Sequence, residues 1–335
     1  MMKLLRYLLF PIVPIYYLVT WFRNKLYDWG VKKSTSYDFP VICVGNLSVG
    51  GTGKSPMIEY LIRLLKSEHH LATLSRGYKR QTEGFVIADE NASASSIGDE
   101  PFQFYQKFED IIVSVDANRV HGISQLTALS NPPEIILLDD AYQHRKVKAG
   151  FNILLTAFDD LYTKDILLPT GNLREPRQGA DRADIIVVTK CPENLSEERK
   201  AHIVKGINPL RHQHVFFASI VYATSVRNNS DQLELRTLKN RPFTLVTGIA
   251  NPKPLVVYLK SLGLEFEHLK YKDHHDFSET DIIGLKQKPL IVTTEKDMVR
   301  LQPRFKESGV LYYLPIEIRI DRPSEFDTLI GNFVK

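Results

Sequence analysis

The sequence predicts an α/β protein with a doubly wound sheet core, a second and smaller α/β domain, and an N-terminal apolar segment. Short apolar runs alternate with polar or amphipathic stretches over residues 39–190, a polar stretch at 225–242 interrupts this pattern, and further apolar runs follow it. Such alternation is typical of a parallel sheet covered by helices on both faces. We therefore expect an N-terminal segment at 1–23, a sheet core at 24–224 and a smaller domain at 225–335.

The composition is that of a globular chain. Its 43% hydrophobic and 24% charged residues exclude the collagen-like, disordered and disulfide-stapled classes. Cys43 and Cys191 lie far apart and outside any CxxC or Cys/His cluster, so we expect neither a disulfide nor a zinc site. The formal net charge is +4, yet residues 1–35 hold six Lys and Arg against Asp28 alone. Because positive charge is not spread along the rest of the chain, we expect no nucleic-acid partner.

Residues 7–22 form an uncharged, aromatic-rich run of sixteen residues. A straight membrane-spanning helix needs about 20 residues, and we expect Pro11 and Pro14 to disturb the middle of this one. An interfacial helix, with Trp and Tyr at the headgroup level and Lys and Arg against anionic lipid, fits the same residues. A buried N-terminal helix and a signal peptide are the alternatives, but no small-residue cleavage site follows Phe22. We predict a retained membrane anchor, with spanning and interfacial attachment both open.

A glycine-rich loop lies between the apolar run at 39–46 and an amphipathic stretch that begins near residue 57. Its sequence matches the phosphate-loop pattern G-x-x-x-x-G-K-[ST] everywhere except at the first glycine. In such loops backbone N–H groups surround phosphate oxygens, the lysine reaches the β- and γ-phosphates, and the hydroxyl binds Mg²⁺. The pattern predicts a nucleoside triphosphate site in a P-loop NTPase-like core, with a plain glycine-rich turn as the alternative. The predicted nucleotide-binding residues are Ser48, Val49, Gly50, Gly51, Thr52, Gly53, Lys54 and Ser55.

An acidic pair ends the apolar run EIILLDD at 134–140. Four apolar residues precede Asp139 and Asp140, which places both carboxylates at the carboxyl end of a strand, where open parallel sheets bind ligands. A pair of aspartates after an apolar run also occurs by chance. Because a phosphate loop supplies little negative charge to retain a cation, we predict that Ser55, Asp139 and Asp140 hold Mg²⁺.

Nine segments of the sequence resemble the tetraacyldisaccharide 4′-kinases, the lipid A 4′-kinase family. In chain order they are GNLSVGGTGKSP at 45–56, SRGYKR at 75–80, GDEP at 98–101, LLDDAYQHR at 137–145, LPTGNLREP at 168–176, VTK at 188–190, GIANP at 248–252, DHHDF at 273–277 and TTEKD at 293–297. The resemblance implies transfer of the γ-phosphate of ATP to the 4′-hydroxyl of an acylated glucosamine disaccharide 1-phosphate in lipid A biosynthesis. It implies the cytoplasmic face of a Gram-negative inner membrane and no obligatory protein partner.

The resemblance also implies an aspartate–histidine pair that bridges the two domains. It assigns this pair to Asp99 of GDEP and His274 of DHHDF, with His275 as the fallback, and Lys54 completes the catalytic set. A carboxylate that orients an imidazole fixes its tautomer and raises its basicity, which suits a group that accepts a hydroxyl proton. The alternative for Asp99 is a helix cap. Metal binding by the two histidines is not favoured, because no third ligand follows at a recognisable spacing.

Weaker expectations concern the LREP segment and several basic or aromatic residues. Glu175 is expected to bind the metal or support the site, with an exposed ion pair as the alternative. Guanidinium groups suit phosphate and a tyrosine ring stacks on a sugar. The residues predicted to contact substrate are therefore Arg76, Tyr78, Arg119 and Arg174, with ordinary surface roles as the alternative for each. No role is assigned to Gln143, His144, Lys296 or Asp297.

A membrane-tethered regulatory NTPase that acts on a protein partner is the main alternative function. The segment TKCP at 189–192 lacks the aspartate of a guanine-reading motif, and a switch protein has no need of a base for an acceptor hydroxyl. A scaffold with an inactive nucleotide fold is not favoured either, because the phosphate-loop lysine and serine and both aspartates of the acidic pair are present.

Overall fold

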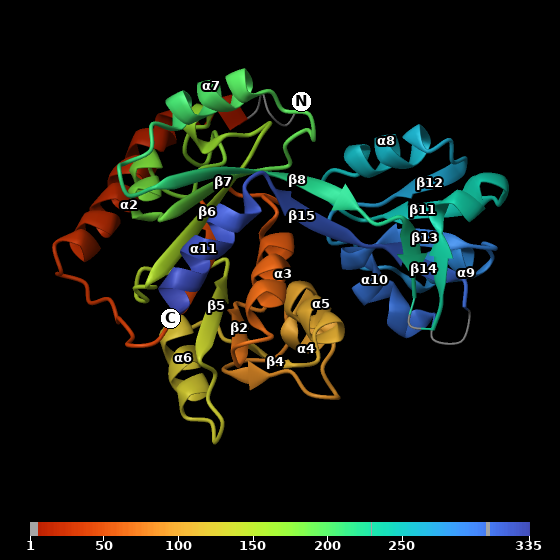
Figure 1. The fold of residues 1–335 in the computed structure, drawn as a ribbon, viewed down its shortest axis with the longest axis horizontal. Helices are drawn as coiled ribbons and strands as arrows, with labels where there is room; N and C mark the ends of the chain where they lie inside the picture. Colours follow the sequence, from red (N-terminus) through yellow and green to blue (C-terminus); the bar gives the residue numbers. More distant parts are fainter. Residues whose placement is uncertain (1–5, 229, 306–308) are drawn as a thin grey trace.

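The larger of two sheets forms the centre of the structure (Figure 1). The computed structural model describes residues 6–228, 230–305 and 309–335. Within these residues the larger sheet has nine strands in the order β15-β8-β7-β6-β1-β5-β2-β4-β3, parallel except for the edge strands β3 and β15. The strands are β1 (Val41–Asn46), β2 (Leu71–Ser75), β3 (Val86–Ile87), β4 (Ile111–Val115), β5 (Ile135–Asp139), β6 (Phe151–Ala157), β7 (Ile185–Thr189), β8 (His214–Tyr222) and β15 (Ile316–Ile320).

Helices cover both faces of this sheet. Ile42 and Val44 of β1 point into one core, while Val41 and Cys43 point into the other, so the strand is apolar along its whole length. We call the sheet and its helices the first lobe. Its helices are α2 (Val13–Asp28), α3 (Lys54–Leu65), α4 (Ala94–Ile97), α5 (Asp99–Lys107), α6 (Arg119–Thr127), α7 (Glu197–Ile207) and α11 (Pro323–Val334), with short 3-10 turns η1 (Phe10–Ile12), η2 (Tyr162–Lys164) and η3 (Arg177–Arg182). The α/β class with a large parallel sheet is confirmed.

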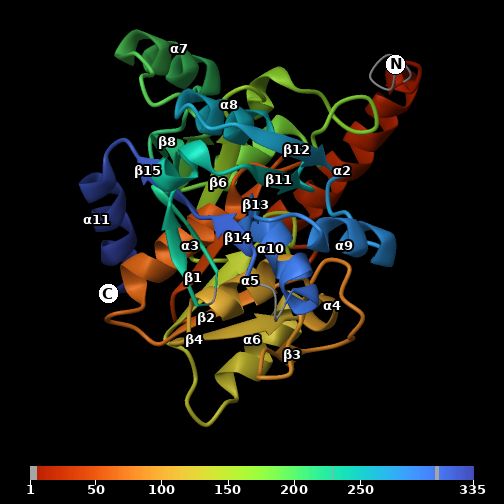
Figure 2. The ribbon, with the colours of Figure 1, turned by 90° about the vertical axis from the view of Figure 1, so that its right-hand side faces the viewer.

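The second lobe is built on a smaller sheet, in the order β10-β9-β14-β13-β11-β12 within the described residues. The residues predicted to be a linker or ribbon, 225–242, form an antiparallel pair of strands and a 3-10 turn. The elements of this lobe are β9 (Ser225–Arg227), β10 (Gln232–Glu234), η4 (Leu235–Asn240), β11 (Phe243–Thr247), α8 (Lys253–Ser261), β12 (Phe266–Lys270), α9 (Glu279–Lys286), β13 (Ile291–Thr294), α10 (Glu295–Leu301), η5 (Gln302–Arg304) and β14 (Leu311–Leu314). Figure 2 shows α10 directly against α5 of the first lobe.

The chain returns from the second lobe to the first at Pro315. The apolar run at 310–316 looks like one strand in the sequence, but a proline has no N–H group for a sheet and divides it. β14 ends before Pro315 in the smaller sheet, and β15 begins after it and pairs antiparallel with β8 of the larger sheet. The structure therefore places β15 and α11 in the first lobe, unlike the prediction that 225–335 form one smaller domain.

The N-terminal run forms a helix on the surface of the first lobe. Pro11 lies in η1 and Pro14 in the first turn of α2, where a proline needs no N–H partner. The prediction that these prolines disturb the middle of the helix is therefore wrong. Several apolar side chains of this segment are exposed, among them Leu8, Phe10, Ile15, Leu18, Val19 and Phe22. Within the described residues, no helix combines the length and the hydropathy that crossing a membrane requires.

Phe326 of α11 should carry much of the docking of this helix. Its fully buried ring contacts Tyr60 and Phe216 edge to face, with centroids 5.6 and 5.3 Å away. We expect Phe326→Ala to lower the free energy of unfolding by about 4 kcal/mol in urea titrations, because the change leaves a cavity in a packed core. The matched control Phe22→Ala, at a side chain 52% exposed, should change it by less than about 0.5 kcal/mol. Equal losses in the two variants would contradict this docking.

Candidate active site

The glycine-rich loop connects the buried end of β1 to the start of α3. Gly50 and Gly53 have φ values of +116° and +88°, a region that side chains with a Cβ rarely adopt. Neighbouring segments hold the loop: the N–H of Val49 donates to the Asn172 carbonyl at 2.8 Å, and the Thr189 hydroxyl donates to the Thr52 carbonyl at 2.7 Å. The loop therefore has a defined shape before any ligand binds, with Lys54 and Ser55 at the first turn of α3.

The acidic pair lies beside this loop, because Asp139 of β5 is in register with Val44 of β1. The Lys54 ammonium is 3.7 Å from Asp140 and 3.4 Å from the side-chain oxygen of Asn46. Burial by itself would raise the pKa of Asp140, but the positive charges of Lys54 and Arg174 lower it below its ordinary value. The structure thus brings the predicted phosphate-loop lysine and one predicted metal ligand into direct contact.

Asp139 has the features of a cation ligand. Its side chain is buried, the Ser75 hydroxyl donates to Oδ2 at 3.3 Å, and Oδ1 has no hydrogen-bond partner in the described part of the chain. Burial, together with the nearby charge of Glu100, raises the pKa of its carboxyl. An orphaned carboxylate oxygen next to a second carboxylate supplies oxygen donors of the kind that Mg²⁺ prefers when phosphates and water complete its shell. Among the described residues, no cluster of three or more His, Cys, Asp and Glu side chains could hold a metal.

A second group of side chains joins the two lobes. His274 Nδ1 lies 3.0 Å from Asp99 Oδ2, so a residue of the second lobe meets the first residue of α5. Lys296 approaches the other ring nitrogen, Nε2, at 2.8 Å. Because an ammonium group can only donate, Nε2 accepts this bond. Arg300 Nη2 lies 3.1 Å from Nδ1, but its shorter bond of 2.7 Å goes to Asp99, so a neutral His274 carries its proton on Nδ1 and donates it to Asp99. The two predicted partners are thus in contact, and in this tautomer Nε2 carries the lone pair, which here accepts from Lys296.

Arg300 of α10 also binds this pair, and sequence reasoning missed it. Its Nη2 and Nε atoms donate to Asp99 Oδ2 at 2.7 and 2.9 Å. Although burial opposes the change, the hydrogen bonds from His274 and Arg300 lower the pKa of Asp99 to about 2. Asp99 therefore stays ionised at neutral pH and cannot itself take up a proton there. Arg300 lies outside the nine segments of the family resemblance, so only the packing of α10 on α5 shows that it contacts Asp99.

The adjacent histidine faces its own lobe. His275 Nε2 lies 3.1 Å from Asp281 Oδ2, and its ring packs against Tyr271 and Phe277 with centroids 4.7 and 5.1 Å away. His274 has a φ of +54°, which turns its side chain away from that of His275. The geometry therefore joins His274, rather than the fallback His275, to Asp99.

Electrostatic effects connect this pair to the glycine-rich loop. Lys190, which follows β7, donates to the carbonyl of Gly51. Burial lowers the pKa of Lys190, and the positive charges of Lys54 and Lys296 lower it further. The carboxylates of Asp160 and Asp159 act in the opposite direction and raise it. The positive charge of Lys296 in the second lobe thus lowers the pKa of Lys190, whose side chain bonds the glycine-rich loop. In the sequence Lys190 ends the segment VTK at 188–190 and belongs to the incomplete guanine-reading motif TKCP, but the sequence alone predicts no role for it.

The basic residues predicted to contact substrate divide into two sets. Arg119 is buried behind the acidic pair, where it donates to the main-chain carbonyls of Asp116 and Asp139. Arg174 donates to Asp140 at 3.2 Å and to the Asn46 side chain at 2.9 Å, at the base of the loop. The remaining two, Arg76 and Tyr78, are exposed, and the Tyr78 ring lies 6.0 Å from that of His274.

Glu175 lies in a buried network behind the loop. Its carboxylate accepts hydrogen bonds from Arg182 at 2.9 and 3.1 Å, from Gln143 at 3.0 Å and from Asn24 of α2 at 2.7 Å. Gln143 in turn donates to the Asn46 carbonyl at 2.8 Å, which links this network to the end of β1. The Nε2 atom of His144 is buried and has no hydrogen-bond partner among the residues that the structure describes. Burial, followed by the charge of Arg119, lowers the pKa of His144 to about 4.

Comparisons with known proteins agree with this geometry. The family model described as tetraacyldisaccharide-1-P 4′-kinase matches residues 5–335. A tetraacyldisaccharide 4′-kinase of Flavobacterium johnsoniae is 54% identical over 100% of this chain and 98% of its own length. That of Bacteroides thetaiotaomicron is 44% identical over 98% of this chain and 93% of its own length.

The fold has a solved counterpart. A crystal structure of LpxK from Aquifex aeolicus in complex with ATP matches with a TM-score of 0.79 at 31% identity, covering 99% of this chain and 100% of the other. The similarity therefore includes both lobes. The chain belongs to the tetraacyldisaccharide 4′-kinase family.

Proposed function

We propose that this protein transfers the γ-phosphate of ATP to the 4′-hydroxyl of tetraacyldisaccharide 1-phosphate, the lipid A precursor. Membership of the family along the full chain supports the reaction. The observation that carries the mechanism is the Asp99–His274 hydrogen bond between the lobes. A P-loop NTPase-like core and a base opposite it are the two parts that phosphoryl transfer to an alcohol needs.

The nucleotide is assigned to the loop of residues 48–55. Its backbone N–H groups would surround the phosphates, while Lys54 would leave Asp140 for the β- and γ-phosphates. Ser55, Asp139 and Asp140 would hold Mg²⁺, which neutralises charge on the phosphate oxygens when it is bound. Arg174, which now donates to Asp140, lies where it can contact the same phosphates.

His274 is assigned as the proton acceptor. Its Nδ1–H is held by ionised Asp99, so its Nε2 lone pair can take the proton of the 4′-hydroxyl while that oxygen attacks the γ-phosphorus and ADP leaves. Lys296 must release Nε2 before this proton transfer, and its ammonium group would then contact the transferred phosphoryl group. Tyr78, whose exposed ring lies 6.0 Å from that of His274, is assigned to the sugar, and the exposed Arg76 to its 1-phosphate. Arg119 would support the acidic pair from behind.

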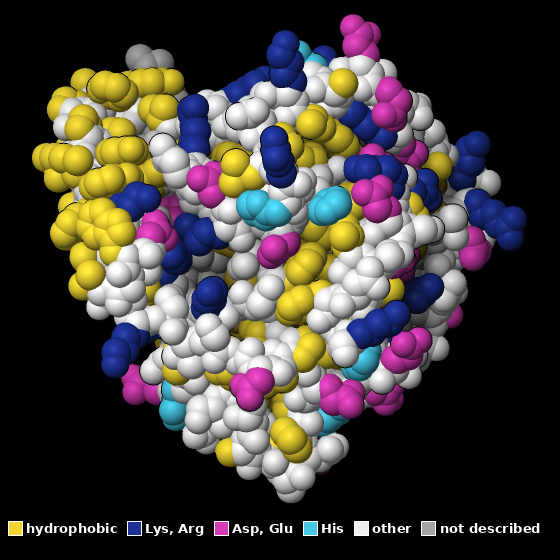
Figure 3. Space-filling view, turned by 60° about the vertical axis from the view of Figure 1, so that its left-hand side comes forward, with side chains coloured by type: hydrophobic (Ala, Val, Ile, Leu, Met, Phe, Trp, Pro, Cys, Tyr) yellow, Lys and Arg dark blue, Asp and Glu magenta, His cyan; other side chains and the backbone are white. Residues whose placement is uncertain are grey.

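The N-terminal segment is assigned to the membrane surface. Figure 3 shows hydrophobic side chains gathered on one projecting part of the molecule, and the exposed apolar residues are concentrated in residues 7–22. An acylated substrate stays in the bilayer at about 0.8 kcal/mol per buried methylene, so the enzyme has to meet it there. We place the protein at the cytoplasmic face of the inner membrane, where ATP is available.

Radiolabel transfer tests the reaction itself. With γ-labelled ATP, Mg²⁺ and tetraacyldisaccharide 1-phosphate, we expect label in the lipid phase, and Lys54→Ala should reduce its rate at least about 100-fold because the charge on the phosphates is lost. Lys205→Ala, at an exposed lysine on α7, is the matched control and should label lipid at the normal rate. Release of free phosphate that depends on Lys54, without labelled lipid, would instead support a regulatory NTPase.

The base assignment is tested by steady-state kinetics. Asp99→Ala and His274→Ala should each lower kcat by about 10²–10⁴-fold with little change in nucleotide affinity. The double variant should be little slower than the slower single variant, because paired residues act as a unit. His275→Ala, which removes the neighbouring imidazole bonded to Asp281, should leave kcat within about threefold. Weaker nucleotide binding with normal turnover at saturation would rule out this role for the pair.

Glu175 is expected to support the site through Gln143 rather than by binding Mg²⁺. Its carboxylate already accepts hydrogen bonds from three residues in a buried position, so Glu175→Gln should lower the free energy of unfolding by about 3 kcal/mol, as for other broken buried pairs. The Mg²⁺ concentration for half-maximal activity should stay the same, whereas Asp139→Asn should raise it. A large rise in the Mg²⁺ requirement of the Glu175 variant, with normal stability, would make it a metal ligand.

A further inference from the structure

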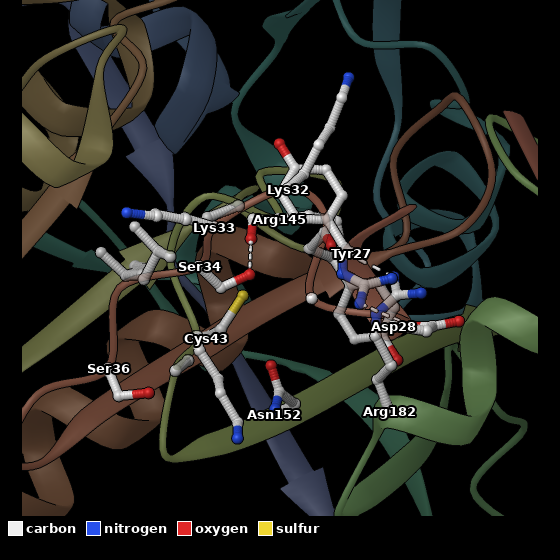
Figure 4. Close-up of a pocket in the computed structure, with 17 residues that line it drawn as sticks. Tyr27, Asp28, Lys32, Lys33, Ser34, Ser36, Cys43, Arg145, Asn152 and Arg182 are labelled. Atoms are coloured by element: carbon white, nitrogen blue, oxygen red, sulfur yellow. Dashed lines mark hydrogen bonds and ion pairs between the residues drawn. The ribbon is translucent and has the colours of Figure 1, made fainter. Parts of the chain in front are cut away.

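A cavity of about 720 Å³ lies beside the C-terminal end of α2 (Figure 4). The segment 30–36, which connects α2 to β1, forms one wall, and residues 141–149 form another. A second cavity of about 470 Å³ lies against the same segment and shares Tyr27, Lys32 and Lys33 with the first. No residue of the glycine-rich loop and neither member of the Asp99–His274 pair lines either cavity, so this space is separate from the proposed active site.

The charge of these walls is strongly positive. The larger cavity is lined by five Lys and Arg side chains and by the single carboxylate of Asp28. Arg145 donates to Asp28 at 2.8 Å and Arg182 to Glu175 at 2.9 Å, so these two guanidinium groups are already paired. In the described part of the chain, four exposed lysines of the two cavities have no carboxylate within ion-pair distance, namely Lys32, Lys33, Lys146 and Lys148. The cavity walls therefore carry positive charge that the protein does not balance locally.

Hydrogen-bonding groups and an apolar floor accompany this charge. The Ser36 hydroxyl and the Asn152 carboxamide line the cavity, and neither side chain has a hydrogen-bond partner among the residues the structure describes. Figure 4 shows Lys32 and Lys33 extending in different directions from one segment, with Ser34 bonded to the Arg145 carbonyl at 2.6 Å. Cys43, Leu138 and Ala141 form an apolar floor. A ligand that fits these walls has an anionic group and a carbon skeleton.

We propose that this cavity binds a phosphate ester, through the phosphate oxygens at the unpaired lysines and through its carbon skeleton on the apolar floor. Ammonium and hydroxyl groups suit phosphate oxygens, and positive walls around a cavity concentrate anions within it. Two sources share this chemistry: the headgroup of an anionic phospholipid and a soluble phosphate ester. Trp29 and Val31, which are 61% and 68% exposed, join the rim to the apolar surface of α2, so a headgroup could enter from the membrane side. The proposal does not depend on the kinase reaction.

The test compares two pairs of lysine substitutions in the full chain. Lys33→Gln with Lys148→Gln removes two charges at the cavity, and Lys205→Gln with Lys286→Gln removes two from exposed lysines on α7 and α9. Lys32 is left in place because it lies over the Tyr27 ring. Binding of labelled glycerol 3-phosphate is measured by equilibrium dialysis with saturating ADP and Mg²⁺, so that the phosphate loop is occupied. Binding to vesicles of phosphatidylglycerol and phosphatidylcholine is measured by sedimentation, against vesicles of phosphatidylcholine alone.

The cavity variant should bind glycerol 3-phosphate or the phosphatidylglycerol vesicles about 25-fold more weakly, because each lysine near a phosphate contributes about fivefold. The control variant should bind both probes as tightly as the unsubstituted protein. A loss seen with glycerol 3-phosphate identifies a soluble ester as a ligand, and a loss confined to phosphatidylglycerol vesicles identifies a lipid headgroup. Because all four lysines are exposed, melting temperatures should match that of the unsubstituted protein, and this is checked first. Equal binding of both variants to both probes, or no saturable binding of either probe to the unsubstituted chain, would overturn the proposal.

Discussion

One partly buried ammonium group bridges the two lobes. Lys107 of α5 lies 2.5 Å from Glu59 of α3 and 2.5 Å from Glu295 of α10, so it bridges carboxylates of both lobes. The Glu59 and Glu295 side chains are only 2% and 7% exposed. Burial, followed by the charge of Glu59, raises the pKa of Glu295 to about 7, and Lys107 opposes this rise. Arg63 also pairs with Glu59 at 3.0 Å, whereas without the ammonium group Glu295 would keep, among the described residues, only the hydrogen bond from the Ile316 N–H. Removal of one partner from a buried ion pair is among the costliest changes in a protein interior.

The same pair of helices holds the proposed base at its other end. α5 and α10 pack against each other, with Lys107 and Glu295 at one end and Asp99 and Arg300 at the other. Val299 of α10 lies between them, in the core of the first lobe. Because His274 belongs to the second lobe, its distance from Asp99 depends on this helix pair and not on its own loop alone. The position of the proposed proton acceptor is therefore a property of the interface between the lobes.

Sequence reasoning predicted the features that a few consecutive residues determine. The structure contains the strand, glycine-rich loop and helix predicted at 39–65 and the acidic pair at the end of β5. Burial of a short apolar run and the positive φ of a glycine each depend on only a few neighbouring residues. Arg300 and Lys190 were missed, since their partners Asp99 and Gly51 lie far away in the sequence and no local pattern marks the contact. The pairing of Asp99 with His274 came from family resemblance alone. The return of β15 to the larger sheet was missed for a similar reason, because its apolar residues would suit either sheet.

Hydrogen bonds among three separate segments of the second lobe fix the backbone at His274. Asp297 Oδ2 accepts the N–H of Gly248 at 2.8 Å, and the Gly248 carbonyl accepts the N–H of His274 at 3.0 Å. A Cβ at Gly248 would lie 2.8 Å from the other Asp297 oxygen, so the contact requires glycine. Burial raises the pKa of Asp297, while the bond from Gly248 favours its ionised form. GIANP, DHHDF and TTEKD thus cooperate to hold one backbone position, at which His274 adopts a left-handed conformation and presents its ring to the first lobe.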